Sequence, residues 1–266
     1  MQITHPGTYW NGIAPENVFI VTEDTGVQIG TGYAIYQYLP HLYPDRPVNI
    51  FFQTEGMRSA RDMLFGALVA RARQLRDSAP GEQARIYTCI PPEDLESADF
   101  FTHSGMNCSE QEIRLRLAIP EGTVHLPMGC STEETPLYLP AQQLAFLERM
   151  QRNDVTHIDA SYLMELMRTA HFHAAGLFSG GQLAGEIMVA GSGPQAEIMA
   201  FYVMPAFRRK GLGTILCRWA LWALSQEGVT ECGARFVTRS LPQKALAKTL
   251  GVGEGEVTAV FPQLFM

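Results

Sequence analysis

The sequence predicts a protein of the α/β (α+β) class that is built from two units of the same design. Strands and helices follow one another in the same order in both halves. A shift of 150 residues superposes 49–90 on 199–240 without a gap. The turn-rich stretch 121–139 lies between the halves and shows no helical or strand period. We therefore expect a first domain at 1–125 and a second at 136–266.

The second half shows the clearer pattern of elements. Two amphipathic helices are expected first, and the second of them begins at Asp159, a residue type that caps helices. Ser179-Gly180-Gly181 separates two β-type runs and therefore predicts a hairpin. In chain order we expect helices at 141–152 and 159–170, the hairpin at 171–193, a strand at 196–205, a helix at 214–228, a strand at 233–238, a short helix at 241–251 and a strand at 256–264.

The first half repeats this order with weaker signals. We expect a hairpin at 17–37, a strand at 46–52, a helix at 63–77, a strand at 84–89, a short helix at 96–106 and a strand at 112–119. The shift places Phe51 on Phe201 and Arg58 on Arg208. Because such identities are few, the shared order of elements carries the prediction of a repeat.

Composition narrows the class of protein. Hydrophobic residues make up 46% of the chain and charged residues 18%, which predicts a globular core. The net charge of −7 argues against nucleic acid as a partner. No apolar stretch is long enough for a membrane span, and no signal peptide is recognisable, so we expect a cytoplasmic protein that binds no membrane. Five scattered cysteines indicate reduced thiols. A homodimer is compatible with this prediction.

The stretch 196–214 carries the most informative motif. An apolar strand runs into the basic triplet Arg208-Arg209-Lys210, and a helix starts just after Gly211 and Gly213. The N-terminus of a helix presents unpaired N–H groups and a partial positive charge, which suit a phosphate. Glycines at such a place let a ligand approach the backbone. The plainer alternative is an ordinary turn in front of a helix with a basic start.

The motif Arg208-x-x-Gly211-x-Gly213, preceded by Val203-x-Pro205, resembles the acyl-CoA signature of the GNAT superfamily of N-acetyltransferases. The resemblance covers roughly 140–266 well and 15–120 in outline. It implies two GNAT-like units, each a mixed, mostly antiparallel sheet flanked by helices, with acetyl-CoA as co-substrate and no metal. It also implies that the CoA pyrophosphate is held by Arg208, Arg209, Lys210, Gly211, Leu212, Gly213 and Thr214, and that the pantetheine arm pairs with the backbone of Phe201, Tyr202 and Val203.

The first half lacks this loop chemistry. Arg61 and Met63 stand where Gly211 and Gly213 fall after the shift, and their side chains would fill the phosphate position. We therefore expect a degenerate copy that completes the fold and shapes the acceptor site, and one acetyl-CoA site in the second half.

Two glutamates are candidates for the general base that takes a proton from the attacking amine. Glu197 lies eleven residues before Arg208, where the resembling histone acetyltransferases carry their base. The alternative is a solvent-facing residue at the start of a strand. Glu186, on the neighbouring strand, is the second candidate.

The proton donor for the thiolate is less well marked. Many members of the superfamily carry a tyrosine four residues before a glycine that corresponds to Gly251, but Ala247 stands there. Ser240 replaces an asparagine that commonly contacts CoA, and we expect it to line the same site. Water or another residue, such as Tyr202, would then protonate the thiolate.

Other polar clusters are better explained structurally. His171 and His173 share a strand face without further metal ligands, and the same holds for His125, Met128 and Cys130 in a loop. Cys217 fits a helix core.

The expected function is direct transfer of an acetyl group from acetyl-CoA to a primary amine of a small molecule or peptide in a ternary complex. A catalytically weak or inactive acyl-CoA-binding module remains the alternative, and a third has another donor, such as succinyl-CoA.

Overall fold

The computed structural model describes residues 1–266 and divides into two compact units. Unit 1 comprises 1–111 and 258–266, and unit 2 comprises 112–257. No helix in either unit is long and apolar enough to cross a membrane.

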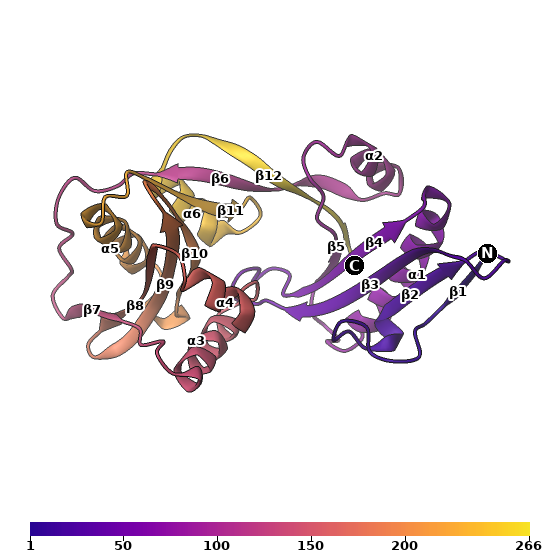
Figure 1. The fold of residues 1–266 in the computed structure, drawn as a ribbon, viewed down its shortest axis with the longest axis horizontal. Helices are drawn as coiled ribbons and strands as arrows, with labels where there is room; N and C mark the ends of the chain where they lie inside the picture. Colours follow the sequence, from indigo (N-terminus) through magenta and orange to yellow (C-terminus); the bar gives the residue numbers. More distant parts are fainter. The chain divides into compact units, whose positions relative to one another are not determined.

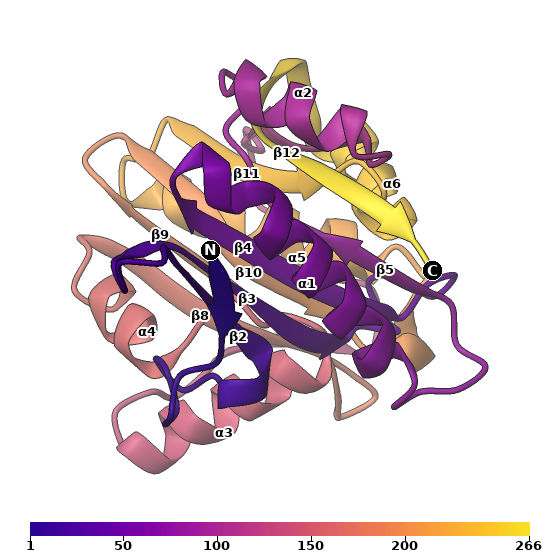
Figure 2. The same ribbon diagram turned by 90° about the vertical axis from the view of Figure 1, so that its right-hand side faces the viewer.

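Unit 1 is a sheet with the order β1-β2-β3-β4-β5-β12, covered on one face by the long helix α1 (Figure 2). The apolar residues Leu64 and Leu68 of α1 recur at helical spacing and are buried against the sheet. The elements of unit 1 are β1 (Gln2–Thr4), η1 (Pro15–Asn17), β2 (Val18–Thr22), β3 (Gln28–Tyr38), β4 (Val48–Gly56), α1 (Arg58–Arg76), β5 (Ala84–Tyr87), α2 (Leu95–His103), the start of β6 (Asn107–Leu117) and the end of β12 (Gly251–Phe265).

Unit 2 is a sheet with the order β6-β11-β10-β9-β8-β7. Helix α5 packs on one face of its strands, and α3 and α4 pack on the other (Figure 1). The elements of unit 2, besides its parts of β6 and β12, are β7 (Cys130–Glu134), α3 (Pro140–Arg152), α4 (Ala160–Leu166), β8 (His171–Ser179), β9 (Gln182–Ser192), β10 (Gln195–Val203), η2 (Pro205–Phe207), α5 (Leu212–Gln226), β11 (Glu231–Val237) and α6 (Leu241–Leu250). As expected, Asp159 caps α4, and its side chain accepts a hydrogen bond from the Tyr162 N–H.

The two units have the same strand register at their centres. In unit 1 the parallel pair β4–β5 aligns Val48 with Ala84. In unit 2 the parallel pair β10–β11 aligns Ile198 with Ala234, which are the same two positions shifted by 150 residues. The pairs β1–β2, β2–β3, β3–β4 and β5–β12 of unit 1 are antiparallel, and so are the pairs β6–β11, β10–β9, β9–β8 and β8–β7 of unit 2. The expected fold class, two mixed and mostly antiparallel α/β units flanked by helices, is therefore confirmed.

The boundaries of the units differ from the expected domains 1–125 and 136–266, because the two halves exchange a strand. Residues 112–117 of β6, from the first half of the chain, pair with β11 of unit 2. The end of β12, from the second half, pairs with β5 of unit 1. Each unit thus takes an edge of its sheet from the other half of the sequence.

Two local expectations also need correction. The stretch 121–139 is more than a connection, since it contains strand β7, which pairs antiparallel with β8. Helix α1 begins at Arg58 and not at 63, so it is a full turn longer than expected at its start.

Candidate functional site

Strands β10 and β11 separate partway along their length. Their parallel pairing ends at Ile198 and Ala234, although β10 continues to Val203 and β11 to Val237. At the same point β10 has a bulge between Ile198 and Ala200 in its pairing with β9. A bulge bends the strand and raises its local twist. The backbone of β10 beyond the bulge therefore has no β11 partner and is available to an extended ligand.

The loop after β10 turns sharply into helix α5. Gly211 is the N-cap and has a φ of 76°, in the left-handed region that favours glycine. A β-carbon on Gly211 would have no heavy atom within 4 Å, so this position faces open space. Arg209 is also left-handed, with a φ of 60°. The first N–H groups of α5 have no acceptor within the helix and are available to a phosphate.

Gly213 has a packing role that the sequence did not suggest. A β-carbon there would lie 3.1 Å from Phe201 Cζ and 3.3 Å from Val203 Cγ2. The missing side chain thus lets α5 pack closely on β10, whereas Gly211 is the glycine that leaves the loop surface open.

The basic residues of the loop are oriented differently from one another. Arg208 Nε donates to the Val203 carbonyl at 2.8 Å, which ties the loop to the end of β10. Lys210 Nζ donates to the Ala206 carbonyl at 3.1 Å and lies over the Phe207 ring. Arg209 is exposed beside the open position of Gly211. Of the three, Arg209 is thus the side chain best placed to meet a phosphate.

The remaining loop positions and Ser240 complete the expected donor site. Leu212 is buried in the core of unit 2, and Thr214 is partly buried in the first turn of α5. Ser240 is the N-cap of α6 and makes no side-chain capping bond. Its hydroxyl is buried without any hydrogen-bond partner. A buried orphan hydroxyl calls for a partner from outside the fold, such as a bound ligand or water.

The corresponding part of unit 1 has no such loop. The first turn of α1 starts at Arg58, so 58–61 is helical where the shift would place the loop 208–211. The pairing of β4 with β5 also continues to Phe51 and Tyr87, three positions further than in unit 2. In unit 1, β4 and β5 stay paired at the positions where β10 and β11 of unit 2 have separated.

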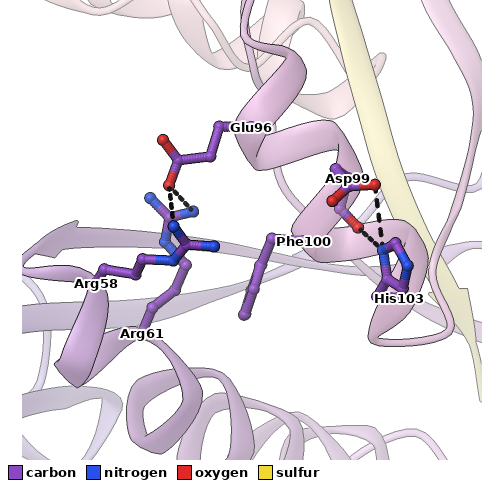
Figure 3. A pocket seen from close by; sticks show the side chains of 6 residues that line it. All are labelled: Arg58, Arg61, Glu96, Asp99, Phe100 and His103. Atoms are coloured by element: carbon purple, nitrogen blue, oxygen red, sulfur yellow. Dashed lines mark hydrogen bonds and ion pairs between the residues drawn. The ribbon is translucent and has the colours of Figure 1, made fainter.

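A cavity of about 250 Å³ lies beside the start of α1 (Figure 3). The guanidinium groups of Arg58 and Arg61 converge on Glu96 Oε1, at 3.9 and 3.7 Å. On the other side of the cavity, Asp99 pairs with His103. The cationic side chains that line the cavity are thus already paired with carboxylates of helix α2.

Glu197 lies on β10 opposite Gly233 of β11, in the pair just before the last one that joins the two strands. Its Oε1 atom is 3.4 Å from Arg114 Nε and 3.4 Å from Arg235 Nε. Its side chain is 21% exposed, so solvent and ligands can reach it. The sequence did not suggest these partners, because Arg114 comes from the strand that we assigned to the other domain.

Glu186 is enclosed. Its side chain is 2% exposed. Arg149 of α3 binds both of its oxygens, at 2.8 and 2.9 Å. Tyr202 O–H donates to it at 2.5 Å, and the Thr135 hydroxyl donates at 3.3 Å. Burial, followed by the charge of Glu186, raises the pKa of Tyr202 far above its usual range. Glu186 thus accepts hydrogen bonds from both Tyr202 and Arg149 inside the fold. This arrangement argues against Glu186 as the general base and against Tyr202 as the proton donor.

The other polar groups singled out in the sequence lie outside this site. His171 and His173 both bind the Glu227 carboxylate, at 2.9 and 2.7 Å. No group of three or more metal-ligating side chains is present among residues 1–266. Cys217 is fully buried in the core of unit 2, and burial raises its pKa well above the usual range. It is a core residue, as expected.

The start of a helix next to two parallel strands that separate is an arrangement suited to an extended, phosphorylated ligand such as an acyl-CoA. Residues 138–251 match the Acetyltransferase (GNAT) family. This match covers less than half of the chain, and it supports an N-acyltransferase of the GNAT type, a class that uses acetyl-CoA as co-substrate.

Several solved structures of low sequence identity have a similar fold. A probable N-acyltransferase of Enterococcus faecalis V583 is 10% identical with a TM-score of 0.53, over 92% of this chain and 61% of that one. A GCN5-related N-acetyltransferase of Sphaerobacter thermophilus is 13% identical with a TM-score of 0.48, over 96% and 83%. A tandem GNAT protein from the clavulanic acid pathway is 16% identical with a TM-score of 0.47, over 93% and 82%. Among curated protein sequences, none matches this chain.

Proposed function

We propose that unit 2 transfers an acetyl group from acetyl-CoA directly to a primary amine of a small molecule or peptide, in a ternary complex. The observation that supports this most is the separation of β10 from β11 immediately before the open loop at Gly211. The unpaired backbone of β10 can pair with the extended pantetheine arm, and the start of α5, which follows it in the chain, can bind the phosphates. Unit 1 has neither feature, so we propose one site per chain.

The transfer needs a nucleophilic amine. The acceptor ammonium loses a proton, its nitrogen forms a bond to the acetyl carbon, and the bond from that carbon to sulfur breaks. The products are the acetamide, CoA thiol and one proton. We propose that Glu197 receives the proton of the ammonium, directly or through water, because its carboxylate is the partly exposed one at the separation.

No protein group stands out as the acid that protonates the departing thiolate. Ala247 offers no proton, and the Tyr202 hydroxyl is bound to Glu186 with a raised pKa. We propose that water supplies this proton. A thiolate is a weak base, so it can leave without a dedicated proton donor. The same observation favours a second candidate function, an acyl-CoA-binding module with little chemistry.

Release of free CoA from acetyl-CoA in the presence of a panel of amines distinguishes the two functions. Amine-dependent release supports the transferase. Tight binding of acetyl-CoA without release beyond the amine-free rate supports the binding module.

The role of Glu197 is tested by E197Q. Loss of a general base typically lowers kcat by about 10²- to 10⁴-fold. We expect such a loss with unchanged affinity for acetyl-CoA, together with loss of the acidic limb of the pH–rate profile. An E197Q enzyme with wild-type kcat and the same acidic limb would place the base elsewhere.

A further inference from the structure

The neighbourhood of Glu197 contains two arginines in an unfavourable arrangement. Arg114 of β6 lies directly opposite Arg235 of β11 in an antiparallel pair. Like charges in this position repel each other and destabilise a sheet. A single oxygen, Glu197 Oε1, approaches both guanidinium groups, at 3.4 Å each. The pair is therefore only loosely neutralised by the protein.

The remaining contacts leave donors on both guanidinium groups open. Arg114 uses its Nε edge toward Glu197, and its side chain is 42% exposed. Arg235 also uses Nε, with Glu112 only at 3.8 Å from its Nη1, and its side chain is 57% exposed. A guanidinium fork with free N–H groups binds a carboxylate in bidentate geometry.

The backbone holds this pair in place. Gly233 of β11 is the strand neighbour of Glu197. The Arg114 guanidinium lies over Gly233, where a β-carbon would come within 3.3 Å of Nη2. The absence of a side chain at Gly233 thus lets Arg114 reach across β11 to the point where β10 and β11 separate.

Unit 1 shows that this openness is specific to unit 2. The equivalent of Arg235 after the shift of 150 residues is Arg85, whose side chain is 1% exposed. Arg85 donates to Asn49 at 2.6 Å, to Gln263 at 2.9 Å and to Glu110. Its strand partner is Phe265, and not a second arginine. The degenerate unit satisfies its arginine internally, whereas unit 2 leaves two arginines open beside the proposed base.

We propose that Arg114 and Arg235 bind the carboxylate of the acceptor, and that the acceptor is a free α-amino acid or another small amine with an adjacent carboxylate. This inference rests on the proposed acetyl transfer. Two cationic forks next to one carboxylate match the adjacent negative and positive charges of such a zwitterion. The acceptor carboxylate replaces Glu197 Oε1 on the arginines, and Glu197 then meets the acceptor ammonium.

The test compares matched acceptors. A pool of L-amino acids is screened for acetyl-CoA-dependent CoA release, and each reactive amino acid is compared with its own carboxamide and its decarboxylated amine. We expect kcat/KM for the amino acid to exceed that of both neutral forms by about 10- to 100-fold, as for one charge-assisted contact. Equal turnover of the amino acid and its carboxamide overturns the carboxylate site and leaves the acetyl transfer intact.

Variants identify the residues. R114Q and R235Q should each remove the preference for the amino acid over its carboxamide, while R114K should keep part of it. R116Q is the matched control, because Arg116 lies on the same strand but is paired with Glu231 at 2.8 Å. Unchanged calorimetric affinity for acetyl-CoA shows that each variant is folded. A wild-type preference in both R114Q and R235Q contradicts the proposal.

A direct binding measurement separates the two proposals. If no amine is acetylated, saturation-transfer NMR of the same amino acid pool with the CoA-bound protein still tests the site. Binding that is present in the wild type and absent in R235Q supports the carboxylate site and rejects the transferase. Absence of binding in the wild type rejects the carboxylate site.

Discussion

Gly213 lies so close to Phe201 that a β-carbon on the glycine would come within 3.1 Å of the Phe201 Cζ atom. The contact joins helix α5 to strand β10 at the point where the strand has separated from β11. A glycine of the acyl-CoA motif, which the sequence assigns to ligand access, therefore also has a packing role.

G213A should destabilise unit 2 by about 1–3 kcal/mol, as expected for overpacking of a well-filled contact. F201L shortens the clashing ring and should recover part of this loss in the double variant. Urea denaturation of the two single variants and the double variant measures the coupling. A G213A protein of wild-type stability that no longer binds acetyl-CoA would instead mean that Gly213 faces the ligand.

Replacement of Glu186 should affect stability before chemistry. E186Q leaves the Arg149 guanidinium without its bidentate partner and weakens the bond from Tyr202. We expect a loss of about 1–3 kcal/mol in the free energy of unfolding, in the range for a buried group left unsatisfied. E148Q is the control, because Glu148 lies on the same helix as Arg149 and its ion pair with Arg152 is exposed. This variant should change the free energy of unfolding by less than about 0.5 kcal/mol. A stable E186Q protein with a kcat reduced as in E197Q would restore Glu186 as a base candidate.

His171 should make the stability of unit 2 depend on pH. Its Nδ1 atom is 2.9 Å from Glu227 Oε2 and its Nε2 atom is 2.9 Å from the Gly193 carbonyl. Both partners are acceptors, so both bonds require the doubly protonated ring. The hydrogen bond to Glu227 raises the pKa of His171 above its ordinary 6.5, against the effect of burial.

A raised pKa means that this stabilisation is complete below pH 6.5 and is lost as pH rises through the higher folded-state value. The melting temperature should therefore fall over this range in the wild type, and H171Q should flatten that slope. H125Q, which changes an exposed histidine, serves as the control. An unchanged slope in H171Q would show that the pKa of His171 is the same in the folded and unfolded protein, which contradicts this account.

Local patterns in the sequence were sufficient for much of the fold. The register of Val48 with Ala84 and of Ile198 with Ala234 follows the same 150-residue shift that aligns the sequences. The hairpin at 171–193 and the helix cap at Asp159 depend on neighbouring residues alone, and both are present.

Features that depend on distant residues could not be predicted in this way. Nothing in the local sequence of strands β6 and β12 specifies that they exchange partners between the two halves of the chain. For that reason Arg114 was not placed beside Glu197. The enclosure of Glu186 was also missed, since Arg149 lies 37 residues away on a helix.

The central claim is that the chain has one acyl-CoA site, at the start of α5 in unit 2. Calorimetric titration with acetyl-CoA tests it most directly. We expect one molecule per chain in the wild type, binding weakened by at least about 100-fold (~2.7 kcal/mol) in G211E, and unchanged binding in G228E, which changes a left-handed glycine (φ 89°) at the other end of the same helix. R58E, at the start of the degenerate unit's helix, should also bind normally. Two sites in the wild type, or full affinity in a folded G211E protein, would contradict the account.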